Sequence, residues 1–122
     1  MSYEAYKVLH ILGILVLFAS LGGMAGVRMM TAAGSTRGPR LFRVLHGVAM
    51  AIVLIAGFGI LSQLGMSSPG TWPLWVWIKV TVWLLLGAAI VILKKSGAQA
   101  GSVLAFLALL GAVAAWSAIV KP

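Results

Sequence analysis

The sequence contains no cysteine, and its only acidic residue is Glu4. The lack of cysteine excludes disulfides, thiol redox chemistry and cysteine-ligated metals or clusters. Charged residues make up 8% of the chain, whereas a soluble domain carries about 25%. Hydrophobic residues make up 62%. These proportions indicate an integral membrane protein.

Four apolar segments are long enough to cross a bilayer, which requires about 20 residues of helix. The segments cover residues 6–30, 41–64, 73–94 and 100–120. The third segment must contain Lys79, because the stretch between Lys79 and Lys94 is too short to span the bilayer alone. Short linkers join the segments. The sequence therefore predicts one all-α transmembrane domain, residues 1–122, folded as an antiparallel four-helix bundle.

Most basic residues fall in or beside the first and third linkers: Arg28, Arg37, Arg40, Arg43, Lys94 and Lys95. Basic linkers face the cytoplasm in membrane proteins, so we expect both termini on the periplasmic or extracellular side of a bacterial inner membrane. The net charge of +8 is then an orientation signal, and the expected partner is the lipid bilayer, not nucleic acid. Tyrosines and tryptophans concentrate on the outer side, as in an interfacial belt.

The first segment carries a histidine near its start. Helical spacing places it on one seam with two small residues and a methionine: His10, Gly13, Leu17, Ser20 and Met24. An ionisable side chain inside a membrane segment is a candidate functional residue. Small residues on a seam let a helix or a flat ligand approach closely. The pair Gly22 and Gly26 has the GxxxG spacing that favours close packing of helices.

The antiparallel arrangement decides which candidate residues lie at the same depth. A turn centred in the first linker places His46 level with Met24 and roughly 20 Å from His10 along the axis. His10 and Lys79 share a depth near the outer face. The sequence thus predicts an outer site, His10 with Lys79, and an inner site, His46 with Met24 or Met50.

Haem b is the cofactor that these residues suggest. Haem iron accepts histidine or a His/Met pair, so His10 and His46 are the candidate iron ligands, and a tetrapyrrole fits between the helices of a bundle. Structural roles compete with this interpretation. Met24 and Met50 suit core packing, His46 suits a lipid phosphate or a backbone carbonyl, and Lys79 suits snorkelling to the interface.

Three pieces of the chain together resemble the HemJ-type protoporphyrinogen oxidases and the wider CopD-like group of four-span proteins. They are Lys7-Val8-Leu9-His10 with Phe18 and Gly22, Trp75-Val76-Trp77-Ile78-Lys79, and Ile119-Val120-Lys121-Pro122. The resemblance implies that His10 and Lys79 act together on a haem or porphyrin. The chain has Gly87-Ala88-Ala89 where that family has a histidine, and it has no acid after Glu4. These departures favour tetrapyrrole binding over catalysis.

The expected function is therefore to bind a haem or related tetrapyrrole for electron transfer, haem handling or oxidation of a porphyrin. A membrane redox partner or a homo-oligomer would fit such a role. The alternative is a structural or assembly subunit that packs on a larger membrane complex without a cofactor. A small multidrug transporter is disfavoured, because that class needs an acidic residue within the membrane and Glu4 precedes the first segment.

The charge asymmetry of the linkers generates a test of orientation. In a Ser35→Cys variant, the thiol should resist an impermeant reagent in intact cells, because the first linker faces the cytoplasm. A Ser2→Cys variant should react readily. If only the Ser35→Cys variant is labelled, the first linker faces outward and the predicted orientation is wrong.

Overall fold

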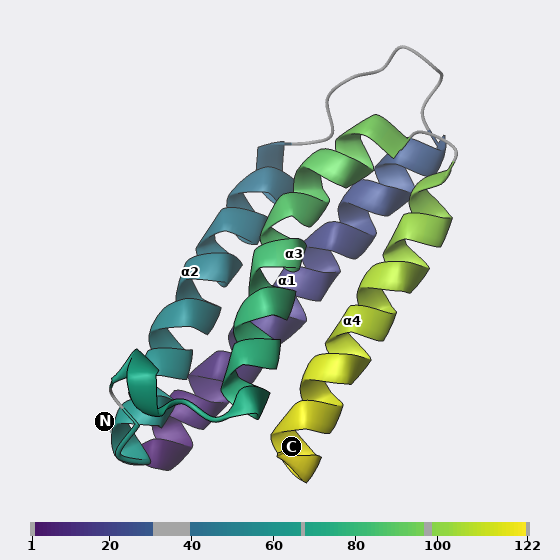
Figure 1. The fold of residues 1–122 in the computed structure, drawn as a ribbon. Coiled ribbons are helices and arrows are strands. Elements are labelled where there is room, and N and C mark those ends of the chain that lie inside the picture. Colours follow the sequence, from purple (N-terminus) through teal and green to yellow (C-terminus); the bar gives the residue numbers. More distant parts are fainter. Residues whose placement is uncertain (1, 31–39, 67, 97–98, 122) are drawn as a thin grey trace.

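The computed structural model describes residues 2–30, 40–66, 68–96 and 99–121. Its long helices are α1 (Tyr3–Met30), α2 (Arg40–Gln63), α3 (Leu74–Ser96) and α4 (Ala100–Val120), and the short 3-10 helix η1 (Pro69–Thr71) precedes α3. Each long helix is apolar enough to cross a membrane. Successive helices run in opposite directions, so α1 begins and α4 ends at the same end of the bundle (Figure 1). The predicted all-α membrane bundle is confirmed.

Helix α1 is the central element of the bundle. It contacts each of the other three helices and packs most extensively against α2, whereas α2 and α3 share only a small contact. The buried residues of α1 are Gly13, Leu17, Ser20, Leu21, Met24 and Ala25. They include every member of the predicted seam except His10, which is half-buried. Most of the seam therefore packs against protein.

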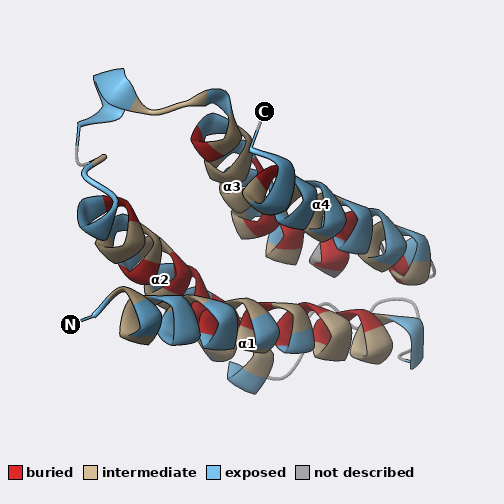
Figure 2. Cartoon of the chain, turned by 90° about the horizontal axis from the view of Figure 1, so that it is seen from below, coloured by how far each residue is buried: buried red, intermediate tan, exposed pale blue. Residues whose placement is uncertain are grey.

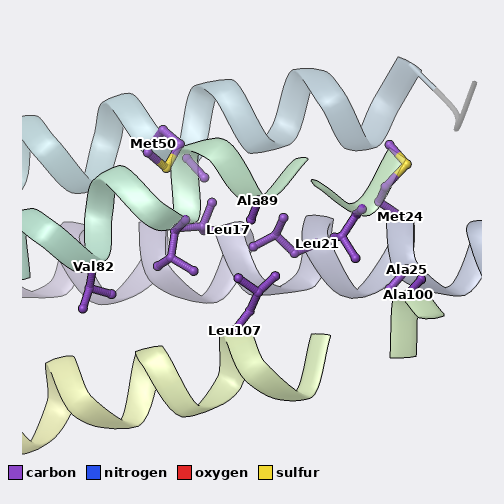
Figure 3. Close-up of a cluster of buried hydrophobic side chains, with 12 residues drawn as sticks. Leu17, Leu21, Met24, Ala25, Met50, Val82, Ala89, Ala100 and Leu107 are labelled. Atoms are coloured by element: carbon purple, nitrogen blue, oxygen red, sulfur yellow. The ribbon is translucent and has the colours of Figure 1, made fainter. Parts of the chain in front are cut away.

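Apolar side chains from all four helices meet along that seam. Figure 3 shows Leu17 of α1 toward Val82 of α3, and Leu21 near Ala89 of α3 and Leu107 of α4. Met24 and Ala25 lie at the other end of the cluster, with Ala100 of α4. Burial is confined to the inward faces of the helices (Figure 2). The outward faces carry many exposed large hydrophobic residues, as expected where hydrocarbon replaces water.

Glycines let α1 and α2 approach closely. A Cβ at Gly13 would lie 2.9 Å from Cγ2 of Val53 and 3.2 Å from its backbone nitrogen. The ring of Phe42 lies on Gly23, and the ring of Tyr6 lies on Gly59. In contrast, nothing lies within 4 Å of the position that a Cβ would take at Gly22 or at Gly26. The close packing predicted for the GxxxG pair is therefore wrong within one chain.

These contacts also correct the predicted register of α1 against α2. Gly23 meets Phe42, and Gly13 meets Val53. His46 therefore lies level with Ser20, about one helical turn from Met24, the predicted neighbour. The prediction assumed a turn centred on residues 34–36, and the contacts of Gly23 with Phe42 and of Gly59 with Tyr6 place α1 about one helical turn away from that alignment.

The close approach at Gly13 generates a test of stability. Gly13→Ala should lower the free energy of unfolding by about 1–3 kcal/mol, because the new methyl group overlaps Val53, including its backbone. Gly22→Ala is the matched control and should be neutral or stabilising by up to about 1 kcal/mol, because its methyl group enters open space and alanine favours helix. Denaturant titration in detergent micelles, followed by circular dichroism, measures both. Equal effects would contradict the observed packing.

Candidate functional site

The imidazole of His10 connects α1 to α2. Its Nδ1 lies 3.0 Å from the backbone oxygen of Val53. A carbonyl oxygen only accepts hydrogen bonds, so Nδ1 carries the proton and donates it. In the neutral ring, Nε2 then keeps its lone pair. The ring lies beside Gly57, where a Cβ would be 3.3 Å from its Cε1. Local packing thus fixes both the orientation and the tautomer of His10.

Helix α1 begins and α4 ends at the same end of the bundle, which we call the terminal end (Figure 1), and basic side chains act on one another there. The charge of Lys79, on α3, acts on His10. The charges of Lys7 and Lys121 act in turn on Lys79. Lys79 and His10 thus lie on two helices that contact each other, α1 and α3, and that they form one site stays a prediction.

His46 lies inside the bundle and is 6% exposed. Its Nε2–H donates to the backbone oxygen of Leu86 at 3.0 Å, which connects α2 to α3. The remaining nitrogen, Nδ1, is the one nearer its own backbone. His46 therefore makes the kind of backbone contact that the sequence offered as its structural role.

The two methionines predicted beside His46 belong to the hydrophobic core. Met24 is completely buried. The Cε of Met50 would lie 2.9 Å from a Cβ at Gly87, so the thioether end fills the space that this glycine leaves. Packing accounts for both positions, and Met24 is also out of register with His46.

The corrected register brings the two histidines closer along the axis than predicted. His10 contacts Val53 and Gly57, which lie two to three turns after His46 on α2. The axial separation is therefore roughly 10–16 Å, not 20 Å. At that separation, and with Nε2 of His46 bonded to the backbone of Leu86, we expect the histidines of one chain not to share an iron.

Among the described residues, no three histidine, cysteine or acidic side chains gather into a metal-binding group. In the part of the chain that the structure describes, histidine, cysteine and acidic side chains therefore do not form a metal site by themselves. Haem differs, because the porphyrin supplies four nitrogens and the protein supplies one or two axial ligands. His10 offers one such ligand, because its Nδ1 donates to Val53 and its Nε2 then keeps a lone pair.

A shallow groove of about 540 Å³ lies between α3 and α4, and neither histidine lines it. Its walls are mostly apolar, with Gln99 and Ser102 as the polar members. It belongs to the half of the bundle away from the terminal end. The groove is thus a separate feature from the His10 site.

Sequence reasoning missed two contributions to this arrangement. Trp83 donates from Nε1 to the backbone oxygen of Met50 at 3.1 Å, and Lys121 reaches the ring of Trp75, with Nζ 5.5 Å from its centroid. The sequence could have indicated the contact of Lys121 with Trp75, because an up-down bundle brings the end of α4 level with the start of α3. The sequence could not have indicated the hydrogen bond of Trp83, because an indole inside a membrane helix has many carbonyls within reach.

Comparisons with protein-family models, curated proteins and solved structures found no match. The resemblance to HemJ-type oxidases stays a hypothesis that rests on the short motifs themselves.

The hydrogen bond of His46 generates a second test of stability. His46→Ala should lower the free energy of unfolding by about 1–3 kcal/mol, because it removes an interhelical hydrogen bond and leaves a cavity. Gly47→Ala is the control in the same turn, where nothing lies within 4 Å of the added methyl group. Unfolding in detergent micelles measures both variants. A neutral His46→Ala would mean that the contact with Leu86 contributes nothing to stability.

Proposed function

We propose that the protein binds haem b or a related tetrapyrrole at the terminal end of the bundle, with His10 as an axial ligand. The observation that carries this proposal is the hydrogen bond from Nδ1 of His10 to the backbone of Val53. Metal-ligating histidines almost always donate their second ring N–H in this way, which fixes the ring and makes the ligating nitrogen more basic. The Nε2 of His10 is prepared for that role.

The basic surroundings of His10 support the same proposal. The propionates of haem are anionic, and Lys79 is the half-buried ammonium whose charge acts on His10. Lys79 can pair with a propionate or take the second axial position. Bound haem supplies one-electron chemistry. The chain contributes a fixed imidazole, a neighbouring positive charge and apolar helices that exclude water.

The resemblance to HemJ-type oxidases points to the same two residues, His10 and Lys79. The polar groups that this chain lacks relative to that family favour electron transfer or haem handling over oxidation of a porphyrinogen. Electron transfer would require a redox partner in the same membrane. The basic linkers support placement in a bacterial inner membrane, with the terminal end on the outer side.

One observation favours the second candidate function, a structural or assembly subunit. Gly22, Gly26 and Gly47 have nothing within 4 Å of the position of a Cβ. Glycine weakens a helix by about 1 kcal/mol relative to alanine, and no contact within the described chain requires these three. A helix of a partner subunit or of a second copy could approach the chain there.

The haem proposal predicts a specific spectrum. Protein expressed with ample haem and purified in detergent should show a Soret band, and His10→Ala should abolish it or shift it strongly, because the axial nitrogen is lost. His46→Ala should leave the band largely intact, because its imidazole lies two to three turns away. Lys79→Met should weaken haem binding if Lys79 pairs with a propionate, or change the spin state if Lys79 ligates iron.

Two results would contradict the assignment. Loss of the band in His46→Ala with retention in His10→Ala would move the site into the bundle interior. A folded wild-type protein with no Soret band, even after reconstitution with haem, would favour the subunit interpretation. Circular dichroism on each sample separates loss of haem from loss of fold.

A further inference from the structure

Two lysines from different helices approach the same indole at the terminal end. Nζ of Lys79, on α3, lies 5.8 Å from the centroid of the Trp75 ring, and Nζ of Lys121, just beyond α4, lies 5.5 Å from it. The backbone of Lys121 is left-handed and its N–H donates to the oxygen of Ser117, which ends α4 beside the start of α3. The two ammonium groups are therefore within about 11 Å of each other.

A third lysine belongs to the same group. Lys7 lies near the start of α1, at the same terminal end as the start of α3 and the end of α4 (Figure 1), with Nζ 5.7 Å from the centroid of the Tyr3 ring, and its charge also acts on Lys79. Three helices thus bring like charges together, although like charges repel across such distances. The whole sequence has one acidic residue, Glu4, so acidic side chains of this chain can neutralise at most one of the three lysines.

Aromatic residues beside the lysines indicate the depth of this group in the membrane. Trp72 lies between Phe58 and Trp77, with ring centroids 5.9 Å and 5.2 Å apart. Its Nε1–H donates to the backbone oxygen of Met66. Tryptophans concentrate at the level of the lipid headgroups, where the ring is in apolar surroundings and the N–H is in polar ones. We therefore expect the lysines to lie at the depth of lipid phosphates.

We propose that Lys7, Lys79, Lys121 and Trp75 form a binding site for the phosphate of an anionic phospholipid in the adjacent leaflet. A zwitterionic lipid brings its own cation, whereas phosphatidylglycerol brings an uncompensated negative charge that three ammonium groups can share. The indole, which already has two ammonium groups over it, forms the floor of this site. The proposal goes beyond haem binding and does not depend on it. Lys79 is common to the two sites, whereas Lys121 and Trp75 have no part in ligating iron.

Lipid selectivity in native mass spectrometry tests this proposal. Protein released from mixed micelles with equal amounts of phosphatidylglycerol and phosphatidylcholine should retain the anionic lipid in excess. Lys121→Gln should lower that excess about fivefold, the effect of one lysine at a charged membrane surface. Lys121→Arg should preserve it, because the charge remains. Lys95→Gln is the matched control, because Lys95 is an exposed lysine at the opposite end of the bundle, and it should change nothing.

Other outcomes would overturn the proposal. The first is equal retention of the two lipids by the wild type, and the second is an unchanged excess of phosphatidylglycerol in Lys121→Gln. The third is an equal loss of that excess in Lys95→Gln, which would indicate a general effect of charge. Displacement of phosphatidylglycerol by millimolar inorganic phosphate would assign the site to a soluble anion instead of a headgroup. Lys7→Gln is a second variant, independent of the end of α4, and should also lower the excess.

The lipid test is separate from the haem test. Lipid selectivity is measured on protein without haem, and His10→Ala should keep it, because the ring of His10 packs on Val53 and Gly57 of α2, whereas Lys79 and Lys121 approach Trp75 of α3. Loss of the Soret band in His10→Ala with retained lipid selectivity supports both proposals. Loss of lipid selectivity in His10→Ala would place the anion at His10 and contradict the assignment to Trp75 and Lys121.

Discussion

Three hydrogen bonds from ring nitrogens to backbone carbonyls connect the helices of this bundle. His10 donates to Val53, His46 donates to Leu86, and Trp83 donates to Met50. A helical carbonyl already accepts from the N–H four residues later, and it has a second lone pair for such a donor. The hydrocarbon of a membrane contains no water that could bond to a polar ring, so the ring must find its hydrogen-bond partner within the protein. Two of these bonds join α2 to α3, the pair of helices with little other contact.

The same bonds determine the chemistry that remains available. An imidazole that donates from Nδ1, as His10 does, keeps Nε2 as a base or a ligand, whereas His46 has the opposite arrangement. Two histidines that look equivalent in the sequence therefore differ in the structure. His10 is half-buried near basic side chains, and His46 is enclosed in the core. This difference is why the tetrapyrrole proposal rests on His10 alone.

Hydropathy and spacing predicted most of the fold. The length of the third apolar segment required Lys79 to lie within it, and antiparallel connections then brought Lys79 to the depth of His10. The buried face of α1 followed from helical periodicity, with Gly13, Leu17, Ser20 and Met24 on it. Each of these inferences uses only the rise of a helix and the thickness of a bilayer, which hold for any sequence.

What the sequence could not predict depends on the shapes of particular contacts. The rings of Phe42 and Tyr6 seat on Gly23 and Gly59, and these contacts shift α1 by about one turn from the position that the linker suggests. Hydropathy treats Gly22 and Gly23 alike, although only Gly23 faces another helix. The tautomer of His10 and the approach of Lys121 to Trp75 likewise depend on which atoms the packing brings together.

The central position of α1 has a consequence for how the protein is made. The α1–α2 pair contains its own glycine contacts and the bond from His10 to Val53, so this hairpin can close as soon as both helices leave the translocon. The other side of α1 must wait for α4 to be translated, because Phe18 packs on Gly111 and Met29 packs on Gly101 of α4. During that interval lipid chains cover Phe18 and Met29 at little cost, because hydrocarbon solvates them as well as α4 does. Helix α4 therefore joins the bundle by exchanging lipid contacts for protein contacts.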